Sequence, residues 1–285
     1  MQILELLFPS LASVISITAL GALFGIVLSI AKIKLHVERD KRYGYIMDAL
    51  PGANCGACGF PGCGGYAMKI LEGSAPINLC MVGGKEAVEK LSRIMDIAAE
   101  AQSPVKARVH CQGGSDVTTP RFAYDGPLSC TAAQQIMGGY KVCQYGCLGL
   151  GDCERSCLFD AIHLNARGIP EVNWEKCTGC GACVDACPRK IISLENEAIG
   201  VHVRCGNLEK APVMKKGCSV GCIACNRCVK ACKEVFADNP EIETAIEVVN
   251  FCAVINYETC INCGKCAEVC PNNVIEFQRA PVIAG

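Results

Sequence analysis

Cysteine is the residue type best placed to do chemistry in this chain, and its spacing is as informative as its number. The chain has 25 cysteines among 285 residues. Disulfides, zinc and iron–sulfur clusters are the uses that such a density indicates. Most of the cysteines fall in five tight groups, at positions 55/58/63/80, 143/147/153/157, 177/180/183/187, 218/222/225/228/232 and 260/263/266/270. Disulfides need particular Cα separations and Cβ directions, which such crowded groups do not offer, so we expect metal.

Two of the runs share one pattern, C-x2-C-x2-C-x3-C-P, and begin at Cys177 and Cys260. In bacterial ferredoxins, three cysteines of this run bind one [4Fe–4S] cluster and the fourth binds the other cluster of a pair. Zinc sites generally use two separated pairs of ligands, which makes zinc the weaker interpretation. Each run follows a partner group that ends in C-x3-C, so the region 141–278 is one ferredoxin module written twice.

Crossed ligation of paired clusters predicts four sites in this region. Site A takes Cys143, Cys147, Cys153 and Cys187, and site B takes Cys157, Cys177, Cys180 and Cys183. Site C takes Cys222, Cys225, Cys228 and Cys270, and site D takes Cys232, Cys260, Cys263 and Cys266. Cys218 is an alternative to Cys225 in site C, because 218/222/228 repeats the spacing of 143/147/153. We prefer Cys225, since it gives the commoner C-x2-C-x2-C turn.

Short strands are expected between the cysteine groups. Residues 161–165 and 169–173 predict one hairpin, and residues 245–249 and 252–256 predict a second. Aromatic residues make up only 6% of the chain, so large core-forming side chains are scarce. We expect bonds to the clusters to replace a large apolar core.

A fifth cysteine motif near the amino terminus has the form C-x2-C-x4-C-x16-C. It consists of Cys55, Cys58, Cys63 and Cys80, here called the N-terminal site. Surrounding glycines allow tight turns and a close approach of the backbone to a bulky inorganic group. We expect a [4Fe–4S] cluster, with a structural zinc knuckle as the alternative. An amphipathic helix is predicted over 84–102, with Val88, Leu91, Met95 and Ala98 on one face.

The first residues of the chain predict a membrane anchor. Residues 6–31 carry no charge, and about 20 apolar residues suffice to cross a bilayer. Lys32, Lys34, Arg39, Lys41 and Arg42 follow, whereas residues 1–5 carry no Lys or Arg. The positive-inside rule then places the N-terminus outside and the cysteines in the cytoplasm, where thiols stay reduced. A cleaved signal peptide is the alternative, but the basic n-region and the cleavage pattern are absent.

Several functions are excluded by what the sequence lacks. A net charge of −1 and a pI near 6.4 remove the electrostatic basis for binding nucleic acid. No G-x-G-x-x-G follows a predicted strand and no P-loop is present, so nucleotide chemistry must lie elsewhere. The sequence shows no recognisable Ser/His/Asp catalytic arrangement. The four histidines are scattered along the chain, so we expect surface or hairpin positions for His36, His110, His163 and His202.

These pieces in this order resemble the B subunit of the Rnf complex, the ion-translocating ferredoxin:NAD oxidoreductase of bacteria and archaea. The membrane span, the Cys55–Cys80 motif and the segment 143–153 leading into a ferredoxin run carry the resemblance. It implies an electron-transfer subunit that takes electrons from reduced soluble ferredoxin toward NAD through partner subunits, coupled to Na⁺ or H⁺ translocation, without a catalytic site of its own. A tethered polyferredoxin serving a hydrogenase or corrinoid activator is one alternative, and a zinc-stabilised scaffold is another.

The predicted fold class is α+β, with a single N-terminal transmembrane helix, a small glycine-rich [4Fe–4S] domain and two tandem bacterial-type 2[4Fe–4S] ferredoxin modules. The expected boundaries are 1–31 for the anchor, 32–102 for the N-terminal domain, 103–140 for a connecting segment, and 141–204 and 205–285 for the modules.

Five clusters leave five cysteines without a role. Cys111, Cys130, Cys205 and Cys218 are either ligands of a sixth cluster or small buried apolar residues. Cys252, on a predicted hairpin strand, is expected to be a small buried apolar residue.

Overall fold

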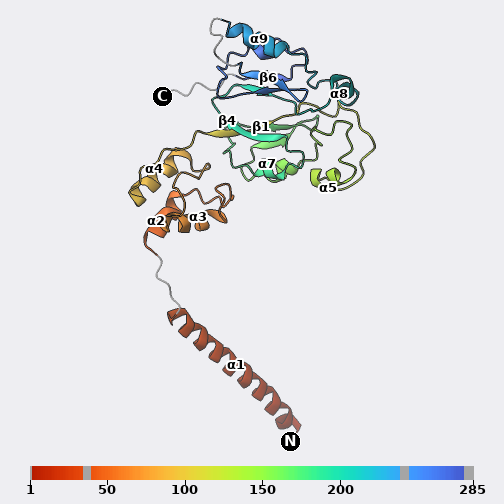
Figure 1. The fold of residues 1–285 in the computed structure, drawn as a ribbon. Coiled ribbons are helices and arrows are strands. Elements are labelled where there is room, and N and C mark those ends of the chain that lie inside the picture. The colour runs from red at the N-terminus through yellow and green to blue at the C-terminus, as the bar shows by residue number, and fades with distance from the viewer. Residues whose placement is uncertain (1, 35–39, 238–243, 279–285) are drawn as a thin grey trace. The chain divides into compact units, whose positions relative to one another are not determined.

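The computed structural model describes residues 2–34, 40–237 and 244–278, and it divides into two units, Met1–Tyr43 and Gly44–Gly285. The first unit holds one long helix, α1 (Gln2–Lys34), drawn in red in Figure 1. Its segment Val14–Lys34 is long and apolar enough to cross a membrane, in agreement with the predicted anchor. The hydroxyls of Thr18 and Ser29 donate to backbone carbonyls one turn earlier, so these polar groups are satisfied within the helix.

The second unit begins with a small helical domain of α2 (Arg42–Ala49), α3 (Gly62–Leu71) and α4 (Gly84–Met95). Its buried residues include Ile46, Tyr66, Ile70 and Leu91. The helix predicted over 84–102 exists but is shorter, because Asp96 adopts a left-handed conformation (φ 55°, ψ 40°) that ends α4. Ala98 therefore lies outside the helix, and that part of the prediction was wrong.

The two ferredoxin modules are built from short elements. The first module contains β1 (Val105–Val109), α5 (Cys130–Gln135), α6 (Asp152–Arg155), β2 (Ile162–Leu164), β3 (Pro170–Val172), α7 (Ala182–Ala186) and β4 (Ile192–Asn196). The second contains β5 (Val201–Val203), α8 (Ala211–Gly217), α9 (Arg227–Val235), β6 (Ile246–Val249), β7 (Cys252–Ile255), α10 (Lys265–Glu268) and β8 (Ile275–Phe277). The mixture of helix and strand confirms the α+β class.

All strand pairs are antiparallel, and two of them are the predicted hairpins. In β2–β3, Ile162 pairs with Val172, and in β6–β7, Ile246 pairs with Ile255. The other two pairs are long-range: β1 pairs with β4 (Figure 1), and β5 pairs with β8. Each module is thus closed by its own first and last strands. Strand β1 lies in the expected connecting segment 103–140, and β5 lies a few residues before the expected start of the second module at 205.

Each module has its own small core in which cysteines pack beside aliphatic residues. In the first, Cys147, Cys153, Cys183 and Cys187 are buried with Ile162, Ile169 and Ile192. In the second, Cys228, Cys232 and Cys266 are buried with Val201, Ile246 and Ile275. The cysteine sulfurs therefore point inward, where they can act together.

The contact between β5 and β8 yields a first testable prediction. A methyl group at Gly200 would overlap the backbone carbonyl oxygen of Gln278, whose N–H donates to the Gly200 carbonyl. We expect Gly200→Ala to lower the free energy of unfolding by about 1–3 kcal/mol, because the backbone cannot move aside easily. Denaturant titration followed by circular dichroism measures the change.

The control for this substitution is Gly44→Ala, at an exposed position in α2 with no atom within 4 Å of the added methyl group. There we expect a small gain in stability, since alanine favours helix over glycine. Equal effects at the two positions would contradict the close approach of β5 and β8.

Candidate iron–sulfur centres

All 25 cysteines lie in the described residues, and all of them are free thiols. Burial, with smaller contributions from neighbouring thiolates, raises the pKa of Cys183 and of Cys266 to about 12. Such thiols keep their protons in the absence of metal, whereas a bound metal ion displaces those protons and holds several thiolates together. The clustering of inward-facing cysteines therefore suits metal ligation rather than disulfides.

The N-terminal site is assembled by the loop before α3 and the loop before α4. Cys63 is the second residue of α3, and its N–H donates to the Asn54 side-chain oxygen at 2.9 Å. A methyl group at Gly62, where φ is +76°, would lie 2.8 Å from that oxygen, so glycine is required there. Cys80 Sγ accepts a hydrogen bond from the Gly83 N–H at 3.3 Å.

The four cysteines of the N-terminal site lie close enough to interact electrostatically. Burial raises the pKa of Cys80, and thiolates at Cys63, Cys58 and Cys55 raise it further. Tyr66 holds the segment before Cys80 in place.

Tyr66 is almost completely buried, and its hydroxyl donates to the Pro76 carbonyl at 2.7 Å and accepts from the Leu79 N–H at 3.1 Å. These two bonds fix the segment that leads into Cys80. The spacing of the cysteines in the sequence does not indicate that Tyr66 has this positioning role.

Sites C and D each form a partly open cavity lined by the four cysteines predicted for them. The cavity with Cys222, Cys225, Cys228 and Cys270 has a volume of about 360 Å³. The cavity with Cys232, Cys260, Cys263 and Cys266 has a volume of about 350 Å³. Cys218 does not line the cavity of site C, so the structure favours Cys225 there.

In site B, the thiolates of Cys177, Cys180 and Cys157 all raise the pKa of Cys183, after the larger effect of burial. The four predicted residues of site B therefore lie together. The neighbouring first turn of α7 begins after Gly181, whose left-handed backbone (φ 82°, ψ −6°) turns the run between Cys180 and Cys183.

In site A, Cys143 lies apart from the other predicted cysteines and lines a different cavity. Cys153 lies near Cys130 and Cys187, whose thiolates add to the larger effect of burial in raising the pKa of Cys153 to about 12. Cys143 instead faces Cys111, Cys205 and Cys218, which line a separate cavity with it. The prediction that Cys143 joins Cys147, Cys153 and Cys187 does not match this arrangement.

The reason for this difference lies in the repeat. The residue three after Cys222 is Cys225, whereas the residue three after Cys147 is Leu150. Cys130, at the start of α5, comes to this place because the Asp152 carboxylate accepts from the Cys130 N–H at 3.0 Å and the Thr131 N–H at 2.9 Å. No spacing motif surrounds Cys130, so the sequence alone could not assign it.

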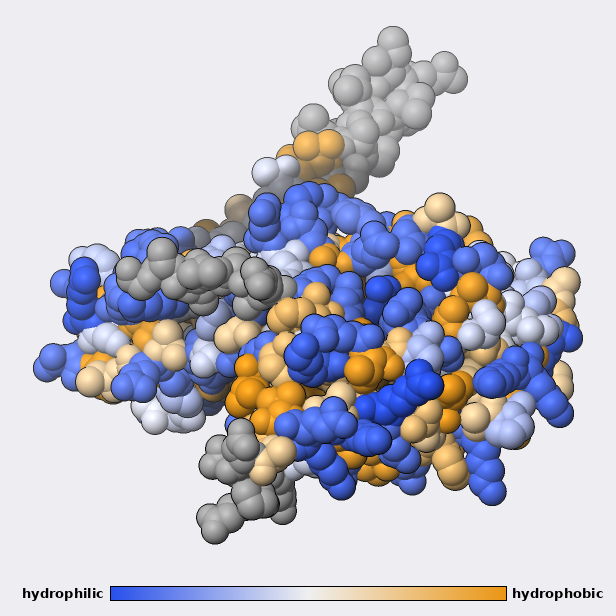
Figure 2. Space-filling model, turned by 90° about the horizontal axis from the view of Figure 1, so that it is seen from above, coloured by the Kyte–Doolittle hydropathy of each residue, from blue (hydrophilic) through white to orange (hydrophobic). Residues whose placement is uncertain are grey.

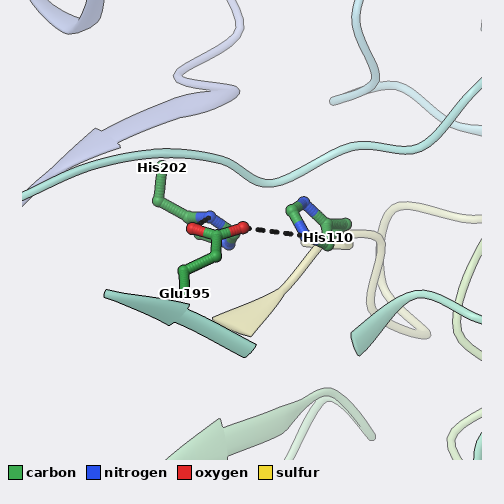
Figure 3. Close-up of side chains that lie close together, drawn as sticks. All are labelled: His110, Glu195 and His202. Atoms are coloured by element: carbon green, nitrogen blue, oxygen red, sulfur yellow. Dashed lines mark ion pairs between the residues drawn. The ribbon is translucent and has the colours of Figure 1, made fainter. Parts of the chain in front are cut away.

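A second departure from expectation is a trio of the half-buried His110 with the buried Glu195 and His202 (Figure 3). His202 is only 3% exposed, so its predicted surface position was wrong. His110 Nε2 lies 3.3 Å from one oxygen of Glu195, and His202 Nδ1 lies 3.7 Å from the other. Burial pushes the pKa of Glu195 upward, but the neighbouring imidazoles of His110 and His202 and the hydrogen bond from the Ser193 hydroxyl outweigh burial and hold the pKa well below its ordinary range.

The two histidines link β1 and β5 reciprocally. His110 Nδ1 contacts the Val203 carbonyl at 2.9 Å, and His202 Nε2 contacts the Val109 carbonyl at 3.0 Å. Because each imidazole is anchored on the backbone of the opposite strand, the trio is a polar junction between the modules. His163 is exposed on β2 as expected, and His36 lies outside the described residues.

A helix long and apolar enough to span a membrane, followed by cysteine-lined sites in two ferredoxin-type modules, defines an iron–sulfur protein of the electron-transfer class. Residues 50–82 match the family described as "Putative Fe-S cluster". Residues 170–193 and 253–276 match the 4Fe-4S binding domain family. By these matches and those of its curated relatives, the chain belongs to the family of B subunits of the Rnf-type ion-translocating oxidoreductase complexes.

Three relatives, all B subunits of such complexes, are matched over most of their length. The one from the Na⁺-translocating ferredoxin:NAD⁺ oxidoreductase complex of Acetobacterium woodii is 42% identical over 255 residues, which are 90% of this chain and 74% of that protein. The one from the ion-translocating oxidoreductase complex of Methanosarcina acetivorans is 36% identical, over 93% of this chain and 97% of that protein. The one from the proton-translocating ferredoxin:NAD⁺ oxidoreductase complex of Clostridium ljungdahlii is 35% identical, over 91% of this chain and 89% of that protein.

The role of Tyr66 is testable by removing only its hydroxyl. We expect Tyr66→Phe to lower the free energy of unfolding by about 1–3 kcal/mol, because the Leu79 N–H and the Pro76 carbonyl lose their buried partner. The segment before Cys80 should loosen, so iron should leave the N-terminal site sooner on heating. Denaturant titration and iron release measure the two effects.

The matched control is Tyr45→Phe, since Tyr45 is 64% exposed on α2. A loss of stability as large in Tyr45→Phe as in Tyr66→Phe would contradict the positioning role.

Proposed function

We propose that this chain takes electrons from a reduced soluble ferredoxin and passes them through a row of [4Fe–4S] clusters to partner subunits that lead to NAD. Membership of the Rnf-type family supports this role over that of a polyferredoxin serving a hydrogenase or corrinoid activator. Two relatives are named for ferredoxin:NAD⁺ oxidoreductase complexes, one Na⁺-translocating and one proton-translocating. The transported ion is therefore Na⁺ or H⁺, and it crosses through other subunits.

Five clusters are supported by ligand sets whose cysteines lie together. The N-terminal site and sites B, C and D keep their predicted cysteines, and site A keeps Cys147, Cys153 and Cys187. Each cluster, when bound, supplies a one-electron relay whose potential the protein tunes. The observation that carries the assignment is the pair of cavities of nearly equal volume, about 360 and 350 Å³, each lined by one predicted set of four cysteines.

The sites follow one another without a break inside each module. The Cys55 thiolate adds to the effect of burial in raising the pKa of Cys180, which indicates that the N-terminal site lies near site B. The thiolate of Cys153 in site A likewise contributes to the raised pKa of Cys183 in site B. The thiolate of Cys228 in site C contributes to the raised pKa of Cys266 in site D. Neighbouring ligands of successive sites give electrons a short path.

The second module offers the best entry point for a soluble donor. Cys225 of site C and Cys263 of site D are exposed, unlike the other ligand cysteines. Beside them, α9 presents Arg227, Lys230 and Lys233, which form no ion pair within the described part of the chain. The face seen from above carries many hydrophilic side chains around smaller hydrophobic patches (Figure 2). An anionic ferredoxin complements this cationic helix.

The topology of the anchor follows from charge. Lys32 and Lys34 lie in the last turn of α1. Basic residues favour the cytoplasmic side of a span, so the ferredoxin modules face the cytoplasm, where a soluble ferredoxin is available.

The cluster assignment is tested by anaerobic iron and sulfide analysis of the full chain in detergent. We expect at least about 20 irons per chain, four for each of the five sites. Reduction with dithionite should give the EPR signals of interacting [4Fe–4S] clusters. A preparation that holds stoichiometric zinc and little iron would contradict the proposal in favour of a zinc scaffold.

Donor docking is tested by charge reversal on α9. We expect Lys230→Glu with Lys233→Glu to slow reduction by reduced ferredoxin about tenfold at low ionic strength, because electrostatic steering is lost. High salt should narrow the difference from the unmodified chain. Stopped-flow absorbance of the clusters measures the rate.

The control is Lys85→Glu with Lys90→Glu, which places the same charge change on α4. Slowing by the control pair in place of the α9 pair would move the docking site to the N-terminal domain.

A further inference from the structure

Between the two modules lies a third cavity, lined by four cysteines that the five clusters do not use together. It has a volume of about 400 Å³, close to the volumes at sites C and D. Its cysteines are Cys111, Cys143, Cys205 and Cys218. Cys111 and Cys205 lie opposite each other in an antiparallel β-bridge, one after β1 and the other after β5.

The sulfurs converge on the cavity. A methyl group at Gly113 would lie 3.3 Å from Cys218 Sγ and 3.6 Å from Cys111 Sγ. A methyl group at Gly146 would lie 3.3 Å from Cys143 Sγ and 3.7 Å from Cys111 Sγ. Glycine at both positions keeps the space beside these sulfurs open.

Backbone donors meet the sulfurs in a repeated pattern. The Cys147 N–H donates to Cys111 Sγ at 3.3 Å, and the Cys222 N–H donates to Cys205 Sγ at 3.4 Å. Cys147 and Cys222 hold equivalent places in the two modules. Hydrogen bonds of this kind stabilise thiolate ligands and tune the potential of a bound cluster.

A buried cation independently indicates that the cavity holds negative charge. Lys141 lines the cavity and is only 4% exposed. Its ammonium donates one long hydrogen bond, 3.3 Å to the Gly113 carbonyl, and Lys141 forms no ion pair with any carboxylate of the described residues. A buried charge needs a compensating charge, which four thiolates around an iron–sulfur core supply.

The two modules contribute matching halves of this cavity. Each gives the cysteine two residues after its first strand, Cys111 and Cys205, and the cysteine four residues before its first ferredoxin ligand, Cys143 and Cys218. This also explains why the spacing 218/222/228 repeats the spacing 143/147/153. The first cysteine of each series, Cys218 or Cys143, lines the cavity between the modules.

We propose that Cys111, Cys143, Cys205 and Cys218 bind a sixth [4Fe–4S] cluster, here called the bridging site, and that Cys130 takes the place of Cys143 in site A. The proposal rests on the proposed electron-transfer function and completes it. The bridging site lies against site A through Cys111 and Cys147, and against site C through Cys205 and Cys222. It joins two pairs of sites that would otherwise be separate.

Cys252 is then the one cysteine outside the six ligand sets. It is buried on β7, as expected, and its thiol donates to the Cys205 carbonyl at 3.1 Å. Cys252→Ala is therefore a control of the same residue type and similar burial.

The test is anaerobic iron and sulfide analysis of the reconstituted full chain and its variants. The unmodified chain should hold about 24 irons, and Cys111→Ala with Cys205→Ala should hold about 20, with sulfide falling equally. Adding Cys143→Ala to that pair should remove no further iron, since the site is already lost. Adding Cys130→Ala instead should remove up to about four more. Cys252→Ala should keep the full content.

The outcomes separate the proposals. The irons that remain in each variant show that the rest of the chain has folded and loaded. About 20 irons in the unmodified chain, unchanged in the double variant, would overturn the bridging site and leave the five-cluster function intact. Further loss from Cys143→Ala, without loss from Cys130→Ala, would restore Cys143 to site A. A chain with little iron throughout would overturn both.

Discussion

A thiolate buried in protein is unstable without a neighbouring cation, and this constraint governs the whole second unit. Burial raises the pKa of Cys147, Cys153, Cys183 and Cys266 to about 12, so each site tends toward neutral thiols until metal arrives. Metal binding then becomes folding free energy, because ligands from distant segments are joined at one centre. Helices of four or five residues, such as α6, α7 and α10, are too short to be stable alone and depend on these centres.

The two modules are held together by polar and sulfur groups more than by apolar surface. Their aliphatic cores are separate. Between them lie the histidine–glutamate trio, the paired Cys111 and Cys205, and the buried ammonium of Lys141. Such groups require defined geometry, since a buried charge or donor left unpaired destabilises the protein. The junction therefore fixes the relative position of the two pairs of clusters, on which electron transfer depends.

Local patterns in the sequence predicted most of the fold and much of the site. The C-x2-C-x2-C-x3-C-P runs and the hairpins around residues 162–172 and 246–255 are formed by residues close together in the chain. Their spacing can therefore be recognised directly in the sequence. The pairing of β1 with β4, the burial of His202 and the exchange of Cys143 for Cys130 depend on residues far apart in sequence. The early end of α4 depends on one left-handed residue, Asp96, which the hydrophobic periodicity does not report.

The closure of each module by its first and last strands sets an order of events on the ribosome. Val109 of β1 pairs with Ile192 of β4, so at about 5–20 residues per second several seconds of synthesis separate the two partners. During that interval β1 presents an unpaired edge, and Cys111 waits for Cys205 and Cys218 still to be made. Sites that draw on one module can be filled while the nascent chain grows. The last ligand of the bridging site, Cys218, is made before Cys266 of site D and Cys270 of site C, so the bridging site can hold its metal before the second module is closed by β8.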